Sequence, residues 1–379
     1  MLQTRRITTM GSDVFRDEFS LAFDGTNDYI QTALVPNYTN ITMTAWIFCV
    51  ADDNTKAIAT ARDSAADGFL WYMSTSEQLY IKINGENVST SNISVNKWHH
   101  VAFTWDGSTT KLYVDGNLES SGSISGTMDI TTKMEISHDT TANHYFWNGK
   151  MSEITVYNTT LSDSNIKTLY NGGESYNHKE GVASANLKAW WRMGDGIFDH
   201  KATTDDQGGI VCDMTNATLG SDIFGGRGNF TDNSDSYWTF AGAGASNGVI
   251  EDGVCKFNAS GSNNCSLQKA GMLTVGQMYR LDVDVTSVDS TAAGGTSLVV
   301  DDGNPYIRVC ETTDGITSHT MYWVPQNNTA FKLYRYNTNT DGVAYDEAIQ
   351  FDNLRVRAVN GNVGYMENMR PEDFTGDTP

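Results

Sequence analysis

Apolar and polar residues alternate most clearly between residues 98 and 122, WHHVAFTWDGSTTKLYVDGNLESSG. In the first half of this stretch, every second residue falls on one side of the predicted strand: His99, Val101, Phe103 and Trp105. This is the period of a β-strand packed on one face, and residues 111–114 repeat it after a turn. Because Asp115 and Gly116 tolerate the positive φ of a two-residue turn, a tight hairpin should follow. The stretch therefore predicts a local antiparallel sheet.

Further strands are predicted where the same alternation returns. They cover residues 20–31, 41–50, 68–73 and 79–84, and the segment that ends at Tyr157. Residues 161–170 instead predict a helix, which Ser162 or Asp163 would cap and which Gly172 and Gly173 would end. The apolar side of this helix consists of Ile166, Leu169 and Tyr170.

The pattern becomes irregular in the middle of the chain and returns later. Residues 176–235 predict an ordered linker, and strand patterns resume over residues 236–358. Polar residues dominate an N-terminal arm, 1–18, and a C-terminal tail, 359–379. We therefore predict an all-β chain with two antiparallel β-sandwich domains of jelly-roll type in tandem, of which the first covers residues 19–175, plus one short helix.

Four segments of the first domain together resemble a laminin-G-like (concanavalin A-like) jelly roll. They are SLAFDGTNDYIQ (20–31), ITMTAWIFCV (41–50), the stretch from residue 98 that includes WDG and KLYVDG, and GKMSEITVYNTTLSDSNIKTLYNGG (149–173). In the second domain, the succession of WTF, GQMYRL and FDNLRV resembles carbohydrate-binding β-sandwiches of the family-4/9 type. LKAWWRMGDG (187–196) resembles a segment of tailed-phage proteins. These resemblances imply lectin-like folds, which host several functions.

Composition excludes some partners. The 379 residues carry a formal charge of −21, from 46 acidic and 25 basic side chains. Such a surface repels phosphates, so we expect neither nucleic acid nor an anionic membrane as a partner. No apolar run approaches the ~18 residues of a membrane helix, and the first 13 residues lack the apolar core of a secretory signal. The five cysteines form no CxxC pair and predict no disulfide framework.

The sequence shows no motif for catalysis. Asp282 and Asp284 alternate on a strand without the pattern of a general acid and a nucleophile, which is typical of a solvated strand face. The adjacent His99 and His100 should point to opposite faces of a strand and cannot share a metal ion. We interpret His138 as a hydrogen-bonded or solvent-exposed histidine. Because no serine-hydrolase, zinc-protease or P-loop motif occurs, we predict a non-enzymatic protein.

Calcium is an alternative that the jelly-roll resemblance implies. In this family, oxygens near the first strand and an acidic residue of the closing strand often hold one ion. Asp24 matches the first position and Glu153 the second. The family pattern has Asp-Glu where this chain has Ser152 and Glu153, and strand alternation turns Glu153 to the other side. The sequence therefore leaves two alternatives, a calcium site at Asp24 and Glu153 or no calcium site.

Aromatic side chains are the better candidates for ligand binding. The chain has 9 Trp, 17 Tyr and 15 Phe, and sugars stack on such rings while Asn, Asp and Gln bind their hydroxyls. The predicted carbohydrate-binding residues are Trp71, Tyr72, Tyr145, Trp147, Tyr306 and Trp323. Those assigned to the cores are Trp98, Phe103, Trp105 and Trp238.

Together these features predict a structural or adhesion protein of a tailed-bacteriophage virion, such as a fibre, spike or head decoration. Its partners would be a cell-surface or extracellular glycan and other virion proteins, in a homo-oligomer for which a trimer is favoured. The alternative is a bacterial surface adhesin or a non-catalytic accessory module of a polysaccharide-degrading system. A glycoside hydrolase would need a carboxylate pair that the sequence does not show.

Overall fold

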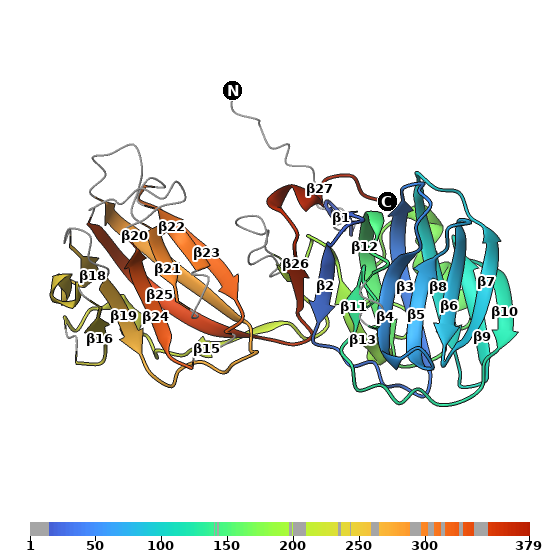
Figure 1. The fold of residues 1–379 in the computed structure, drawn as a ribbon, viewed down its shortest axis with the longest axis horizontal. Helices are drawn as coiled ribbons and strands as arrows, with labels where there is room; N and C mark the ends of the chain where they lie inside the picture. The colour runs from blue at the N-terminus through green and yellow to red at the C-terminus, as the bar shows by residue number, and fades with distance from the viewer. Residues whose placement is uncertain are drawn as a thin grey trace, which may run out of the picture. The chain divides into compact units, whose positions relative to one another are not determined.

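The chain folds into two units, each an antiparallel β-sandwich (Figure 1). Unit 1 comprises Met1–Ala217 and Gly361–Pro379, and unit 2 comprises Thr218–Asn360. The computed structural model describes residues 15–139, 141, 144–196, 199, 210–233, 236–242, 244–258, 265–288, 297–301, 307–311, 315–325, 329–336 and 348–379. The all-β fold class with two sandwiches and one short helix is confirmed for these residues.

The first sheet of unit 1, called sheet 1, has the strand order β10-β9-β8-β3-β12-β1-β27, and β13 pairs with β12. Its strands are β1 (Ser20–Asp24), β3 (Ile41–Cys49), β8 (Trp98–Trp105), β9 (Thr109–Val114), β10 (Asn117–Ser123), β12 (Asn148–Tyr157), β13 (Leu187–Trp191) and β27 (Phe374–Thr375). The predicted hairpin of β9 and β10 is present, with Asp115 and Gly116 both at positive φ.

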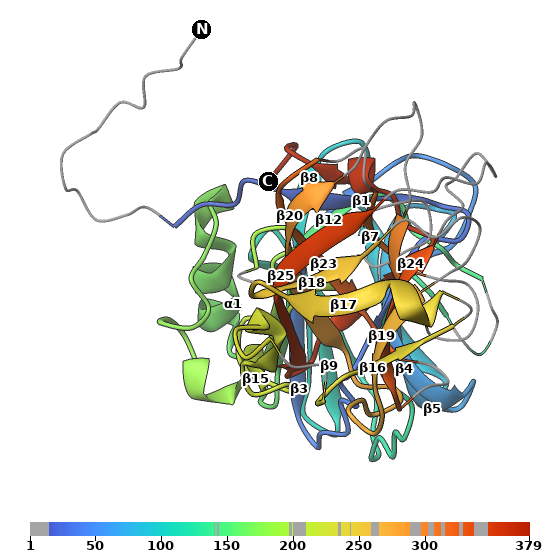
Figure 2. The same cartoon turned by 90° about the vertical axis from the view of Figure 1, so that its left-hand side faces the viewer.

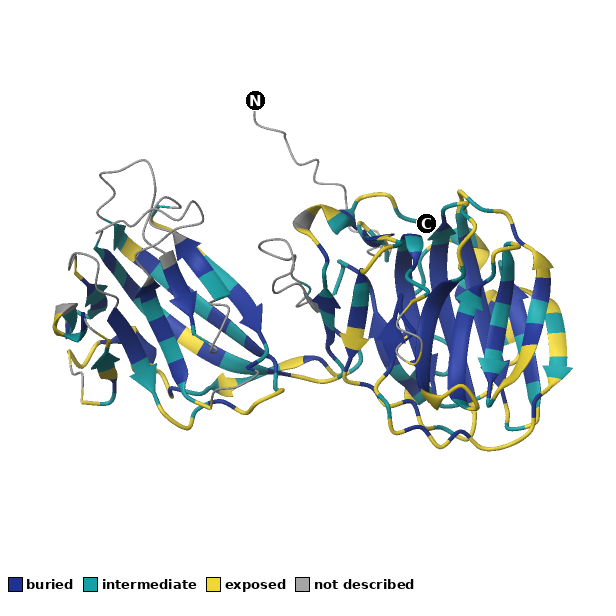
Figure 3. Ribbon diagram, in the orientation of Figure 1, coloured by how far each residue is buried: buried dark blue, intermediate teal, exposed yellow. Residues whose placement is uncertain are grey.

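The second sheet of unit 1, called sheet 2, has the order β14-β26-β2-β11-β4-β5-β6-β7. Its strands are β2 (Tyr29–Thr32), β4 (Lys56–Ser64), β5 (Asp67–Met73), β6 (Gln78–Ile83), β7 (Glu86–Asn92), β11 (Glu135–Ile136), β14 (Ile210–Val211) and β26 (Gly364–Glu367). Exposure alternates along several of these strands, as the banding in Figure 3 shows, so one face of sheet 2 is inside and the other is outside.

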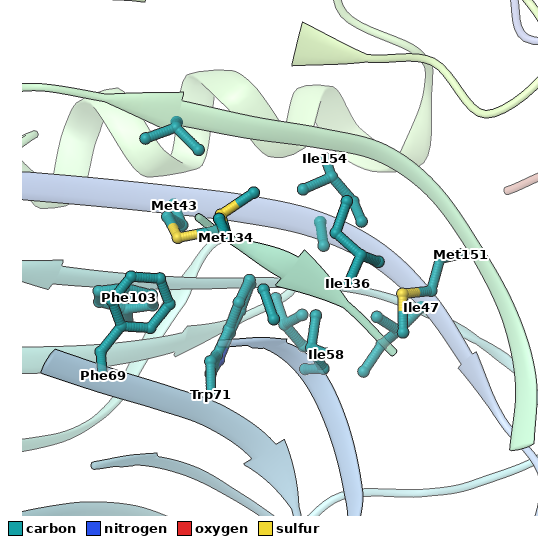
Figure 4. Close-up of a cluster of buried hydrophobic side chains, with 14 of the residues drawn as sticks. Met43, Ile47, Ile58, Phe69, Trp71, Phe103, Met134, Ile136, Met151 and Ile154 are labelled. Atoms are coloured by element: carbon teal, nitrogen blue, oxygen red, sulfur yellow. The ribbon is translucent and has the colours of Figure 1, made fainter. Parts of the chain in front are cut away.

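The core of unit 1 lies between the two sheets and is built from aromatic, methionine and branched aliphatic side chains. Phe69 and Trp71 come from sheet 2 and meet Phe103 of sheet 1, with ring centroids 5.8 Å and 5.3 Å apart (Figure 4). Met43 and Met134 lie beside them in the same cluster. All five side chains are fully buried, so the predicted core position of Phe103 is confirmed.

The helix α1 (Asp163–Tyr170) packs outside this core (Figure 2). The hydroxyl of Ser162 accepts a hydrogen bond from the backbone N–H of Asn165, and Asn171 ends the helix in the left-handed conformation. Ile166 and Leu169 are buried in a second cluster with residues from β8, β9, β12 and β13. Sequence analysis therefore placed this helix and its cap correctly, although Asn171 rather than a glycine forms its C-cap.

The chain order of the two units differs from the predicted tandem arrangement. Residues 361–379 do not form a separate tail, because β26 pairs with β2 and β14 while β27 pairs with β1. The expected linker is divided between the units: residues 176–217 belong to unit 1, where β13 pairs with β12 and buries Trp190 and Trp191, and residues 218–235 belong to unit 2. Unit 2 is thus inserted within the sequence of unit 1. Strands of two to four residues are too short to show a period, and their partners lie far away in the sequence.

Unit 2 contains two sheets. Sheet 3 has the order β17-β18-β25-β20-β23, with β15 pairing with β25, and sheet 4 has the order β16-β19-β24-β21-β22. The strands are β15 (Thr218–Asp222), β16 (Thr239–Ala241), β17 (Gly248–Glu251), β18 (Val254–Phe257), β19 (Cys265–Lys269), β20 (Tyr279–Val288), β21 (Ser297–Val300), β22 (Ile307–Glu311), β23 (Ser318–Trp323), β24 (Phe331–Tyr336) and β25 (Ile349–Asn360). Apolar residues from both sheets, with Trp238, form its core.

Short 3₁₀ segments connect some strands. They are η1 (Asn171–Gly173), η2 (Ser184–Asn186), η3 (Arg227–Asn229), η4 (Ala245–Asn247) and η6 (Pro371–Asp373). Across the described parts of the chain, none of the helices has the length and apolar character needed to span a membrane. All five cysteines are buried and in the thiol form.

Candidate functional site

The outer face of sheet 2 carries a pair of tyrosines that face away from the core. Tyr72 of β5 lies directly opposite Tyr80 of β6, and their rings stack with centroids 5.0 Å apart at an angle of 17°. Both side chains are half-buried. Partial burial and then the neighbouring Tyr80 raise the pKa of Tyr72 to about 12, so its hydroxyl stays neutral at physiological pH. The pair therefore forms a partly exposed aromatic surface on the outer face of sheet 2.

A buried ion pair joins β4 to the segment that follows β11 in the same sheet. The Nε atom of Arg62 donates to Asp139 Oδ1 at 2.9 Å, and its Nη2 atom bonds the other carboxylate oxygen. The hydroxyl of Thr141 also donates to Asp139, at 3.0 Å. Because a two-point contact fixes both planes, Arg62 has a defined position on this face. Its positive charge lies close enough to Tyr72 to affect the ionisation of that hydroxyl.

A second aromatic group lies on the part of sheet 2 formed by β2 and β11. His138 stacks on Phe146 with centroids 4.9 Å apart at 13°, and Tyr29 lies 4.8 Å from the same imidazole. The Nδ1 atom of His138 is 2.5 Å from Glu135 Oε2, while Gln31 donates to the other oxygen of Glu135 at 3.4 Å. This confirms the interpretation of His138 as a hydrogen-bonded histidine. Polar and aromatic side chains therefore lie next to each other on this part of sheet 2.

A pocket of about 270 Å³ adjoins this group of side chains. Its lining consists of Gly25, Asp53, Asn54, Thr55, His144, Tyr145 and Phe146. Tyr145 is held at a φ of 71°, and its carbonyl accepts a hydrogen bond from the backbone of Ala57 at 2.6 Å. The rings of His144 and Tyr145 lie 3.7 Å apart, and Phe146 joins the pocket to the group around His138. We call the outer side chains of sheet 2 together with this pocket the aromatic face.

The aromatic face suits a ligand rich in hydroxyl groups. Half-buried rings offer apolar planes, whereas Gln31, Asp53 and Asn54 offer donors and acceptors at their edges. The two buried carboxylates on the face, Glu135 and Asp139, are already bonded to His138 and Arg62. The arrangement can therefore hold a polar ligand by stacking and hydrogen bonds.

Two of the predicted binding residues lie on the aromatic face, and three do not. Tyr72 and Tyr145 are accessible, and both belong to the face. Trp71 and Trp147 are fully buried in the core of unit 1, and Trp323 is 1% exposed in the core of unit 2. The prediction is corrected for these three tryptophans, because a buried ring has no surface on which a sugar can stack. Tyr306 lies outside the described residues.

The structure does not bring the two predicted calcium ligands together. Asp24 lies at one end of β1 and pairs with Asn148 of β12. Leu21, near the other end of β1, pairs with Met151, and Glu153 lies two residues farther along β12. Glu153 is buried and accepts hydrogen bonds from Trp190 at 2.6 Å and from Arg192 at 3.0 Å. Burial, together with the charge of Asp17, raises the pKa of Glu153 well above its usual range. The predicted ligand pair is therefore wrong.

Asp24 instead borders a separate acidic pocket of about 250 Å³. The lining side chains are Asp24, Asn27, Asp28, Asn368, Arg370, Glu372 and Asp373. Burial, and then the charges of Asp24 and Asp373, raise the pKa of Asp28 to about 7. Within the described parts of the chain, no group of three or more His, Cys, Asp or Glu side chains is arranged to hold a metal ion.

Sequence analysis missed several residues of the aromatic face. Tyr80, Arg62 and the segment Glu135–Asp139 were not proposed for binding, although alternation places Tyr80 and Lys82 opposite the buried Ile81. A count of which aromatic residues fall on the polar side of each strand would have added Tyr80 to the predicted Tyr72. The ion pair between Arg62 and Asp139 joins residues 77 positions apart, so no local pattern indicates it.

In unit 2, Asp282 is not merely solvated as predicted. It accepts hydrogen bonds from Arg280 at 2.8 Å, Arg357 at 2.6 Å and Thr320 at 2.7 Å. Although partial burial opposes it, these bonds hold the pKa of Asp282 below its usual range. The carboxylate therefore organises the outer side of sheet 3.

Residues 24–167 match the family model described as the concanavalin A-like lectin/glucanases superfamily, in its laminin-G-type form. These residues form a concanavalin A-like jelly-roll domain. The domain contains Tyr72, Tyr80 and Tyr145, as well as Arg62 and Asp139. The aromatic face is thus for the most part a feature of the jelly-roll domain, and strand β26 and the C-terminal segment extend its sheets.

Three solved structures illustrate the likeness of fold. A protein from Bacteroides ovatus to which carbohydrate binding is attributed has a TM-score of 0.41 and 18% identity, over 53% of this chain and 56% of that protein. A heptameric pentraxin from Limulus polyphemus has a TM-score of 0.36 and 17% identity, over 45% and 86%. The CBM40 of a Ruminococcus gnavus IT-sialidase, bound to α2,3-sialyllactose, has a TM-score of 0.34 and 10% identity, over 41% and 99%. The chain therefore spans about half the length of the Bacteroides protein. No curated protein matches the sequence.

Proposed function

We propose that this chain binds a glycan on the aromatic face without hydrolysing glycosidic bonds. The observation that carries the proposal is the stacked pair Tyr72 and Tyr80, which presents a half-buried aromatic plane on the sheet that also carries the fixed guanidinium of Arg62. A sugar ring can lie on this plane while its hydroxyls bond polar side chains at the rim. Such a shallow site exchanges bonds with water for bonds with protein, so the affinity of one site is weak.

The two buried carboxylates of the face, Glu135 and Asp139, support binding rather than glycoside hydrolysis. Hydrolysis by the usual route needs one carboxylic acid that protonates the leaving oxygen and one free carboxylate. Glu135 is bonded to His138 and Gln31, and Asp139 is bonded to Arg62 and Thr141. Neither carboxylate has the freedom that a nucleophile or a general base requires.

We further propose that the protein belongs to the virion of a tailed bacteriophage, as a fibre, spike or head decoration, and acts as a homo-oligomer. The resemblance of residues 187–196 to tailed-phage proteins and the weak single site support this role. Several copies on one particle raise the apparent affinity 10²–10⁴-fold through effective concentration, when their geometry allows simultaneous contact. A trimer is the assembly that fits a fibre or spike.

A glycan array with the protein multimerised on a bead tests the binding proposal. We expect glycan signals for the wild type and their loss in Tyr72→Ala/Tyr80→Ala, with a melting temperature within a few degrees of the wild type. Tyr237→Ala is the matched control, since Tyr237 is a half-buried tyrosine of unit 2 that contacts Lys269 and Arg227. A signal that survives the double substitution, or no signal on any glycan, contradicts the proposal.

The virion proposal needs its own measurement. Mass spectrometry of purified particles from the source should find the chain at a fixed copy number relative to a structural protein. Light scattering of the purified chain should give a trimer. Detection of the protein on bacterial cells or with secreted polysaccharide-degrading enzymes, and its absence from particles, would instead favour an adhesin or an accessory module.

A further inference from the structure

A serine, a histidine and an aspartate that are not part of the aromatic face meet at one end of the jelly-roll domain. Ser94 lies in the loop between β7 and β8, His99 is the second residue of β8, and Asp115 forms the turn between β9 and β10. The hydroxyl oxygen of Ser94 is 2.9 Å from His99 Nε2, and His99 Nδ1 is 2.8 Å from Asp115 Oδ2. The three side chains therefore form a continuous hydrogen-bonded chain.

The chemistry of Asp115 determines the direction of these hydrogen bonds. Although partial burial opposes it, the hydrogen bond from His99 and the backbone N–H of His100 hold the pKa of Asp115 below its usual range. An ionised carboxylate only accepts hydrogen bonds, so Nδ1 of His99 carries the proton. With the ring proton on Nδ1, the Nε2 atom is the position that accepts a hydrogen bond from the hydroxyl of Ser94. These are the roles of nucleophile, general base and orienting acid in serine hydrolases.

The surroundings of Ser94 leave it available for reaction. Its side chain is exposed, whereas His99 is 5% exposed. The loop does not depend on the hydroxyl, because Ile93 N–H bonds Glu77 at 2.8 Å and Asn96 N–H bonds Cys49 at 2.7 Å. Among the described residues, the backbone N–H groups of Ser94 and Val95 form no hydrogen bond. N–H groups of a nucleophile and its successor are the donors that stabilise an oxyanion in several hydrolase folds.

We propose that Ser94, His99 and Asp115 form an acyl-transfer centre that hydrolyses short-chain carboxylic esters. The Ser94 oxygen attacks the ester carbonyl while its proton moves to His99 Nε2. The bond to the alkoxy oxygen breaks, and the alcohol leaves with that proton. Water, deprotonated by the same histidine, then attacks the acyl-serine, the bond between the acyl carbon and the Ser94 oxygen breaks, and His99 returns its proton to that oxygen as the carboxylic acid leaves. Ser94 and His99 are catalytic residues, and Asp115 is a positioning residue.

The location of the serine limits the class of substrate. Ser94 lies on the surface and lines neither of the two pockets described above, so neither pocket holds the acyl chain of an ester that reaches Ser94. Short acyl groups such as acetyl are therefore the expected substituents. Glycosidic bonds are not substrates of this centre, and the activity is independent of the aromatic face.

A fluorophosphonate probe with peptide mass spectrometry tests the proposal on the full-length chain. We expect the probe on Ser94 in the wild type and hydrolysis of p-nitrophenyl acetate that disappears in Ser94→Ala. Ser108 is an internal control, because it is an exposed serine bonded to the carboxylate of Asp106 at 2.9 Å. If Ser94 of the folded wild type reacts no faster than Ser108, the proposal is overturned.

The positioning role of Asp115 has a separate readout. In Asp115→Asn, an amide can donate to Nδ1, which moves the ring proton to Nε2 and removes the acceptor for Ser94. We expect ¹⁵N NMR of the histidine ring to report this change of tautomer, and labelling of Ser94 to fall by at least about 10-fold at unchanged secondary structure. Labelling at the wild-type rate with the altered tautomer would contradict the mechanism. If the protein binds glycan but Ser94 is not labelled and Asp115→Asn changes nothing, the acyl-transfer proposal is wrong while the proposed function stands.

Discussion

The inner and outer faces of sheet 2 use neighbouring aromatic residues in opposite ways. Trp71 has no exposed surface and meets Phe103 at 5.3 Å, whereas Tyr72, the next residue, is half-buried and stacks on Tyr80. The indole N–H of Trp71 has no hydrogen-bond partner among the described residues. Trp71 therefore acts only by filling space, while Tyr72 keeps a partly exposed ring and a polar end.

This difference shows that the position along a strand decides the role of an aromatic residue. Because side chains alternate, a shift of one residue moves a ring from the core to the solvent. Tryptophan is the larger and more apolar ring, and in β5 it occupies the inner side. A binding prediction based on ring type alone selects the wrong residue of such a pair. The predictions below test whether the two faces are as separate as the structure indicates.

The largest effect is expected on the inner face. Trp71→Ala should lower the free energy of unfolding by roughly 3–5 kcal/mol, because it removes a fully buried ring and leaves a cavity. Trp71→Phe should cost much less, since it keeps a ring and removes an unpaired N–H. Urea denaturation measures both. A loss below ~1 kcal/mol for Trp71→Ala would mean that this position does not support the core.

The next effect concerns the ion pair on the outer face. Arg62→Met should cost about 3 kcal/mol, because it leaves the fully buried carboxylate of Asp139 without its charged partner. Arg62→Met/Asp139→Asn should recover much of that loss, since the unpaired charge is removed as well. Chemical denaturation of the single and double variants gives the comparison. If the double variant is as unstable as the single one, the packing of Arg62 and not its charge is responsible.

The alternation of residues within strands was predictable from the sequence. The β8–β9–β10 stretch, the core position of Phe103 and the capped helix α1 follow from period and turn residues, which act over a few positions. The return of residues 361–379 to unit 1 was not predictable in this way. The strands β26 and β27 are too short for a period, and their partners in β2 and β1 lie more than 300 positions earlier.

The candidate site was only partly predictable. Tyr72 and Tyr145 were identified because aromatic residues gather there, but the same criterion selected the buried Trp71 and Trp147. The partners that fix the face, such as Asp139 for Arg62, come from different strands and meet only in the folded chain. The chain from Ser94 to Asp115 was missed for the same reason, since a triad is recognised by geometry and not by spacing.

A smaller effect should distinguish the tyrosine pair from a simple surface patch. In a double-mutant cycle, Tyr72→Ala and Tyr80→Ala should show a coupling free energy of about 0.5–1.5 kcal/mol, as stacked rings do. Thermal or urea unfolding of the two single variants and the double variant provides the cycle. Additive losses would mean that the rings are adjacent but do not stabilise each other, and the flat surface proposed for ligand stacking would then not be held in place.

The smallest effect is an alkaline titration of the outer face. Burial raises the pKa of Tyr72 from its usual 10 to about 12, and the nearby Tyr80 adds to this shift. The neutral form is thus favoured by folding, so its contribution to stability is complete below pH 10 and is lost as the pH rises through 12. The difference in absorbance at 295 nm between the wild type and Tyr72→Phe should show one tyrosine that ionises near pH 12. A midpoint at pH 10 would mean that the Tyr72 hydroxyl is fully solvated. The tyrosine pair on the outer face would then not be half-buried.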